Sequence, residues 1–126
     1  MTYAAVTTGA ISNYINPQPP SQPREVLSFE TFTVNSGTNV TLYIRNMGTV
    51  SVSFTSYSVV DPYTGDKYFL NNWSVPTIAP TAMVPVNILI GSSCPGCVLT
   101  GNPFTFTTYD HVTIVTTRDT QFMTQV

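Results

Sequence analysis

Charged residues are scarce in this sequence of 126 residues. It contains four Lys or Arg, six Asp or Glu and one His, and its formal net charge is −2. Such a chain has little material for electrostatic steering, phosphate binding or a clustered acid and base site. Its few basic residues are dispersed, which argues against nucleic acid as a partner. We therefore expect a non-catalytic protein with no cofactor, no metal site and no nucleic-acid partner.

Hydroxyl side chains take the place of the missing charges. The sequence holds 32 Ser and Thr residues, so its surface must be built largely from hydroxyls and amides. Because few carboxylates exist, protonating them at low pH removes few native interactions. The composition favours a passive extracellular surface and predicts an acid-stable protein.

Long apolar runs are also missing. No stretch approaches the roughly 20 apolar residues that a membrane-spanning helix needs. Thr2 to Ile15 has apolar residues at helical spacing, and the Pro-rich segment Asn16 to Pro23 that follows cannot continue a helix. We expect residues 1–24 to form a short helical or extended stub with a spacer, and a membrane anchor to have been removed from this end.

Residues 25–126 change to β-branched and aromatic residues with turn signals at near-regular intervals. This pattern is typical of an antiparallel β-sandwich. We predict one all-β, immunoglobulin-like domain of seven to eight strands, in which Pro85 marks its strand as an edge or a bulge. The expected strands are Glu25–Val34, Val40–Arg45, Val50–Val60, Lys67–Leu70, Met83–Ile90, Phe104–Thr108, His111–Thr117 and Gln121–Val126.

Cys94-Pro95-Gly96-Cys97 is the only pattern with redox or metal chemistry. A redox-active C-x-x-C belongs at a helix N-terminus, whereas this one lies in a Gly/Pro loop between strands. A zinc site would need two more ligands, and the single His111 leaves the set incomplete. We predict a small structural disulfide between Cys94 and Cys97, with a modest effect on stability because the loop is short.

Three acidic residues are candidates for catalytic or metal-binding groups. Asp110-His111 resembles half of a catalytic triad, but adjacent strand residues point to opposite faces, so a surface turn or strand position is expected. Asp61 and Asp66 flank a Pro/Gly turn, where Asp side chains usually cap the backbone. We predict turn chemistry here and a hairpin that joins the flanking strands.

The remaining candidates are surface features. Asn39 and Asn72 begin N-x-[ST] sequons and are possible glycosylation sites. Aromatic residues near the middle of the chain would suit a protein core, a protein interface or a sugar-stacking platform. That aromatic set comprises Tyr57, Tyr63, Tyr68, Phe69 and Trp73. The possible interface residues are Trp73, Val84, Val86, Ile88 and Phe122. The strands Met83–Ile90 and Gln121–Val126 are candidate open edges that pair with another copy.

The order of segments resembles archaeal type IV pilin-like proteins, the group that includes pilins, archaellins and accessory archaellum subunits. An apolar stretch and a Pro/Ser spacer precede a β-domain. The phrases Phe32–Gly37 and Val40–Gly48 look like that family's first hairpin. Ile78–Val86 looks like its turn before the last strands, although Thr81 stands where Gly is usual, and His111–Thr120 looks like its closing strand.

This resemblance implies a non-catalytic archaeal cell-surface protein. The expected role is the exterior domain of an archaellum accessory (stator) subunit, which anchors the motor by binding the S-layer, by self-association, or both. Its place would be the extracellular face of the envelope, and its partners S-layer protein, other filament subunits or a second copy in a homodimer or homo-oligomer. A subunit of a type IV pilus or other adhesive filament is the alternative, and a carbohydrate-binding module is a third.

Overall fold

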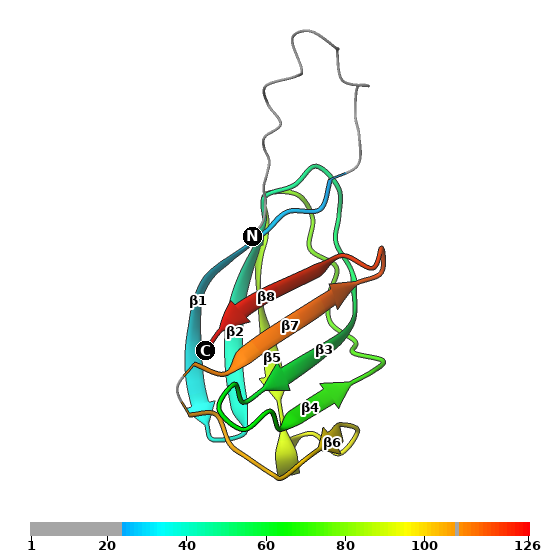
Figure 1. Cartoon of the computed structure of the whole chain (residues 1–126). Helices are drawn as coiled ribbons and strands as arrows, with labels where there is room; N and C mark the ends of the chain where they lie inside the picture. The colour runs from blue at the N-terminus through cyan, green and yellow to red at the C-terminus, as the bar shows by residue number, and fades with distance from the viewer. Residues whose placement is uncertain (1–23, 108) are drawn as a thin grey trace, which may run out of the picture.

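A computed structural model describes residues 24–107 and 109–126. Within these residues, eight strands form two antiparallel sheets that pack face to face (Figure 1). The predicted all-β sandwich is confirmed. The expected N-terminal stub lies outside the described residues, except for Arg24.

The smaller sheet has three strands in the order β1-β2-β5. They span β1 (Leu27–Ser36), β2 (Asn39–Asn46) and β5 (Met83–Leu89). Strand β2 is central, and its alternation of apolar and polar residues buries Val40, Leu42 and Ile44 while the residues between them are half-buried on the outer face. Pro85 lies on the edge strand β5, as the sequence predicted.

The larger sheet has five strands in the order β6-β4-β3-β7-β8. Its strands run obliquely across those of the smaller sheet (Figure 1). The predicted hairpin is confirmed, since β3 and β4 pair antiparallel from Tyr57↔Leu70 to Val60↔Lys67. The strands span β3 (Phe54–Val60), β4 (Lys67–Leu70), β6 (Val98–Thr100), β7 (His111–Thr116) and β8 (Gln121–Gln125).

The core fills the space between the two sheets. β-Branched and aliphatic side chains from both inner faces meet there, among them Ile44 and Ile88 from the smaller sheet and Val59, Val112 and Ile114 from the larger one, all 0% exposed. Twelve of the eighteen buried residues in this cluster lie on the named strands, and the other six lie in the segments that flank them. Burial of that apolar surface is the main force that holds the sheets together.

Two predictions between β5 and β7 are wrong. Val98–Thr100 forms β6 inside a stretch expected to be a loop, because the free edge of β4 accepts it as a partner. Phe104 to Thr107 forms no strand, although one was expected there. This segment connects β6 to β7 of the same sheet instead, and the N–H of Phe106 donates on the way to the carbonyl of Gly37 at the tip of the β1–β2 hairpin.

The strand predicted to begin at Val50 begins at Phe54. Upstream of it, Val52 forms an isolated bridge with Ile78, with two main-chain hydrogen bonds of 2.9 and 2.8 Å. None of the helices in the described residues is long and apolar enough to cross a membrane.

Candidate interaction surfaces

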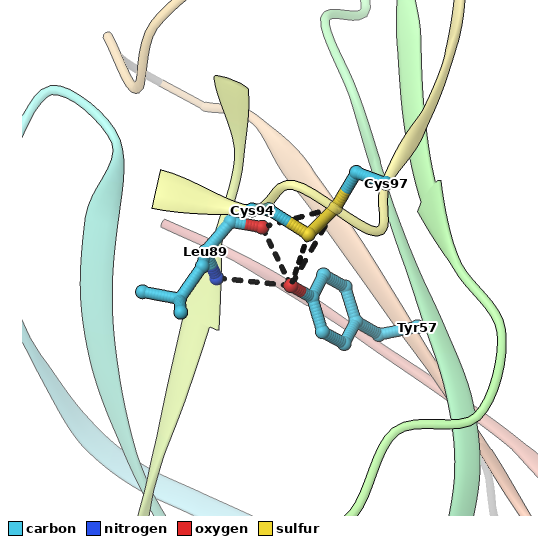
Figure 2. The surroundings of a disulfide bond; sticks show 4 residues. All are labelled: Tyr57, Leu89, Cys94 and Cys97. Atoms are coloured by element: carbon cyan, nitrogen blue, oxygen red, sulfur yellow. Dashed lines mark hydrogen bonds between the residues drawn. A yellow bond between two sulfur atoms is a disulfide. The ribbon is translucent and has the colours of Figure 1, made fainter. Parts of the chain in front are cut away.

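The Tyr57 hydroxyl links the two sheets beside the cysteine loop. Tyr57 lies on β3, and its hydroxyl donates to the carbonyl of Leu89 at 2.5 Å and accepts from the Leu89 N–H at 3.1 Å. The same oxygen lies 3.8 Å from Sγ of Cys94 and 3.9 Å from Sγ of Cys97 (Figure 2). Burial raises the pKa of Tyr57, although the hydrogen bond with Leu89 acts in the opposite direction. The hydroxyl is therefore a protonated structural bridge.

Cys94 and Cys97 are joined by a disulfide in the structure. The loop follows one turn of 3-10 helix, η2 (Gly91–Ser93), which begins at Gly91 with φ +57°. Such a backbone angle favours glycine. Cys94 is buried and Cys97 is half-buried against the core. The disulfide thus lies against the Tyr57 bridge rather than at a helix N-terminus.

A groove of about 490 Å³ opens beside β5. Its walls are the Trp73–Pro76 segment, part of β5 and the cysteine loop, and none of the described residues that line it is charged. The polar side chains in its lining include those of Ser74, Asn87 and Ser93. A surface of this chemistry suits an uncharged, amide-rich or hydroxyl-rich partner and offers no acid or base.

The possible interface residues fall into two groups. Trp73, Val86 and Ile88 are core residues, exposed by 7%, 3% and 0% respectively, so little of their side chains is free for a partner. Val84 and Phe122 are half-buried and pack against that core. Val84, Val86 and Ile88 share one face of β5, so their alternation in the sequence could not separate the half-buried residue from the two buried ones.

The aromatic residues do not gather into a platform. Tyr57, Tyr68 and Trp73 are buried, and Trp73 packs against Phe54 and Tyr57 with ring centroids 5.3 and 4.9 Å apart. Tyr63, by contrast, is 78% exposed in the β3–β4 turn. A flat row of exposed rings that includes Trp73, which a carbohydrate-binding module would require, is therefore not formed.

The two sequons differ in their accessibility. Asn39 begins β2, and its Oδ1 accepts a hydrogen bond from Asn35. The hydroxyl of that sequon, on Thr41, accepts from Asn35 and donates to Asn87 on the neighbouring strand. Asn72 is exposed in a left-handed turn after β4, with φ +54°. Asn72 is the sequon whose geometry leaves its amide open to a glycosyltransferase, and its glycosylation stays a prediction.

Asp110 lies where the sequence predicted a surface position, and this prediction is wrong. The residue is 0% exposed, because its main-chain N–H and C=O pair with Val126 and hold it at the end of the β7–β8 ladder. Its Oδ2 accepts from the N–H of Thr107 at 2.8 Å. His111 is half-buried and contacts Gln125 instead, so Asp110 and His111 form no catalytic pair.

Asp61 and Asp66 act as the sequence predicted, by capping turns. Asp61 Oδ1 accepts from the N–H of Tyr63, and its main chain pairs with Gly65 and Asp66 to close the hairpin. Asp66 Oδ1 accepts from the N–H of Asn102, and this bond, together with the Thr64 hydroxyl, lowers the pKa of Asp66. The described residues contain no group of three or more His, Cys, Asp or Glu that is placed to hold a metal ion.

Glu25 forms a polar cluster that the sequence did not suggest. It accepts from the Thr116 hydroxyl at 2.7 Å and from the Arg118 guanidinium at 2.8 Å, across 91 and 93 residues of chain. Burial alone raises the pKa of Glu25, but the hydrogen bonds from Thr116, Thr120 and Arg118 and the Arg118 charge outweigh it and lower this pKa. The cluster ties the chain before β1 to the β7–β8 turn.

Asp110 and Glu25 act on stability in opposite directions as pH changes. Burial raises the pKa of Asp110 above its ordinary 3.8, and the charge of Asp61 acts in the same direction. The hydrogen bond from Thr107 and the charge of His111 lower this pKa but do not outweigh burial. The native state therefore binds a proton at Asp110 more tightly than the unfolded state, and this residue stabilises the fold progressively as pH falls through its raised pKa towards 3.8. Glu25 has a lowered pKa, so its contribution is present above 4.5 and is lost as pH falls through its native value.

We expect Asp110→Asn to unfold at a higher urea concentration than the wild type at pH 7, because the buried charge is removed while an oxygen remains to accept from Thr107. At pH 3 the two proteins should unfold at nearly the same concentration, since Asp110 is then neutral. Urea titrations at both pH values measure this. Because Oδ1 of Asp110 is buried without a hydrogen-bond partner, the pH dependence is the decisive result: a stability difference between the two proteins that is the same at pH 3 and at pH 7 would contradict the raised pKa of Asp110.

Two solved structures share this fold. The archaellum periplasmic stator protein FlaG from Sulfolobus acidocaldarius matches with a TM-score of 0.54 and 18% identity, over 80% of this chain and 100% of that one. A chain in the complex of the archaellum periplasmic stator proteins FlaF and FlaG from the same organism matches with a TM-score of 0.51 and 17% identity, over 98% of this chain and 100% of that one. The sequence matches no protein-family model and no curated protein. At such identities the likeness shows a common fold.

Proposed function

We propose that this domain is the exterior part of an accessory archaellum subunit of the type IV pilin-like group, on the extracellular face of the cell envelope. It anchors the motor by binding the S-layer, by self-association, or both. The observation that carries the proposal is the fold shared with FlaG and with a chain of the FlaF–FlaG complex, which extends over 80% and 98% of this chain.

The surface supports a passive anchoring role. In the part of the chain that the structure describes, no charged side chain lines the groove beside β5, and two of the six carboxylates, Glu25 and Asp66, accept hydrogen bonds that lower their pKa. Contacts made by hydroxyl, amide and apolar groups persist when the pH falls, whereas contacts made by carboxylates do not. A permanent attachment to a surface lattice requires such contacts and no catalytic turnover.

Deletion of the gene tests this proposal in the source cells. We expect the deletion to abolish swimming and the reintroduced gene to restore it, while adhesion mediated by pili stays unchanged. Swimming tracks and surface adhesion are scored on the same strains. Normal swimming with lost adhesion would contradict the archaellum proposal and would identify a subunit of an adhesive filament instead.

A further inference from the structure

Each sheet has two edge strands, and an edge strand presents unpaired main-chain groups to any chain that approaches. The edges are β1 and β5 in the smaller sheet and β6 and β8 in the larger one. Natural sheets block such edges with proline, charge, bulges or short length. Of the four edges in the described residues, three carry such a block and β8 does not.

The β5 edge is blocked by Pro85 and Tyr57. The N–H and C=O of Leu89 both bond the Tyr57 hydroxyl, so these main-chain groups point away from β2. The direction of the main-chain groups alternates along an antiparallel strand, so those of Pro85 and Asn87 also point away from β2. Pro85 has no N–H to offer there. Two of these three outward positions are therefore closed to a partner strand.

The β1 and β6 edges are blocked by irregularity and length. Strand β1 has register shifts between Phe29 and Thr31 and between Val34 and Ser36, and the residue at the first shift is the charged Glu30. Such bulges twist an edge away from a flat partner. Strand β6 has only three residues.

The β8 edge is regular and uncharged. Its five residues, Gln-Phe-Met-Thr-Gln, pair with β7 in continuous register. Val126 and Asp110 exchange main-chain hydrogen bonds, so even-numbered residues of β8 face β7. The N–H and C=O groups of Gln121, Met123 and Gln125 therefore point away from the sheet, and the Met123 side chain is 63% exposed.

We propose that β8 pairs antiparallel with β8 of a second copy, with the twofold axis at Met123, to form a continuous ten-stranded sheet. With the axis at Met123, each residue whose main-chain groups point outward faces another such residue. Met123 lies opposite Met123, and Gln121 lies opposite Gln125 on both sides of the axis. No other position of the axis pairs all three. Each such pair exchanges two main-chain hydrogen bonds. The proposal thus names the self-association surface of the proposed function and rests on that function for its biological purpose.

The side chains of β8 are complementary to themselves in this register. On the outer face, amide meets amide and thioether meets thioether, while on the inner face Phe122 lies opposite Thr124. No charge on the strand opposes a like charge on its copy, so pairing has no electrostatic cost. Five paired residues bury less than the roughly 1,200 Å² of a stable interface. We therefore expect a reversible dimer that dissociates on dilution.

Two charge variants at the axis test the register. We expect Met123→Lys and Met123→Glu each to move the midpoint of dimerisation to at least about tenfold higher concentration, because like charges would face each other across the axis. An equimolar mixture of the two should dimerise at least as strongly as the wild type, since Lys then faces Glu. Sedimentation velocity of the whole chain over a concentration series gives all four midpoints.

Thr33→Lys on the blocked edge β1 is the matched control, because Thr33 is also exposed on an edge strand, and its midpoint should equal that of the wild type. A wild type that stays monomeric, variants that dimerise normally, or a mixture that does not recover would each overturn the proposal. The same samples are mixed with isolated S-layer. Retention of Met123→Lys by the S-layer leaves the proposed function standing whatever the outcome at β8.

Discussion

Replacing Asn46 by Ala is expected to destabilise the domain by about 3 to 5 kcal/mol, because it leaves several polar groups without a partner in a buried site. Asn46 is 0% exposed at the end of β2. Its Nδ2 donates to the carbonyls of Val50 and Ile78 at 2.7 and 2.9 Å, and its Oδ1 accepts from the N–H of Gly48 at 2.9 Å. Alanine supplies none of these three bonds.

The site cannot easily rearrange around the missing amide. The main chain of Asn46 also bonds Ala82 and Thr81, and Gly48 passes so close to the chain before β1 that a Cβ there would lie 2.3 Å from the carbonyl oxygen of Arg24. One side chain thus joins the end of β2 to the 46–50 loop and to the segment that enters β5. Its loss therefore weakens the end of the sandwich where β2, the 46–50 loop and the segment that enters β5 meet.

Thermal unfolding measures this effect. For a domain of about 100 residues, 3 kcal/mol corresponds to a fall in Tm of more than about 12 °C. Asn35→Ala is the matched control, because Asn35 is exposed and its bonds to Asn39 and Thr41 lie on the surface; we expect a change within about 0.5 kcal/mol. Equal melting temperatures for the two variants would show that the Asn46 amide is not needed.

Trp73→Ala is expected to lower the free energy of unfolding by a similar amount, about 3 to 5 kcal/mol, because it leaves a large cavity in the core. Trp73 is 7% exposed and packs against the rings of Phe54 and Tyr57. Its loss also removes support from Tyr57, whose hydroxyl bridges the sheets at Leu89. Trp73→Phe keeps most of the apolar volume and should lose less.

Urea titration distinguishes a core role of Trp73 from a surface role. The control is Tyr63→Ala, which removes an aromatic ring that is 78% exposed and should leave stability nearly unchanged. If Trp73→Ala unfolded at the same urea concentration as the wild type, the ring would have to be a surface platform, and the carbohydrate-binding alternative would regain support.

Much of the fold could be predicted from local patterns. Val40, Leu42 and Ile44 alternate with polar residues, and Asp61 to Asp66 contains the Pro and Gly of a turn, so β2 and the β3–β4 hairpin are determined by nearby residues. Positions set by distant partners could not be predicted in the same way. Strand β6 forms because it pairs with the edge of β4. Phe104 to Thr107 forms no strand, because Phe106 bonds Gly37 at the tip of the β1–β2 hairpin.

The polar sites illustrate the same limit. Asn46 precedes Met47-Gly48 and resembles any turn residue, yet its amide is buried through partners up to 32 residues away. Asp110 resembles a surface residue because Asp seldom lies in a core, yet the ladder that ends at Val126 buries it. The candidate interface was predicted from apolar residues, whereas the open edge at β8 depends on which main-chain groups point outward, and that follows only from the register.

The most direct test of anchoring is sedimentation of the 126-residue chain with isolated S-layer from the source cells, at neutral and at acidic pH. The pellet is compared with that of the chain alone, which separates lattice binding from self-association. We expect retention in the S-layer pellet at both pH values, together with reversible self-association in the absence of S-layer. A chain that remains a monomer in the supernatant at both pH values would contradict its role as an anchor.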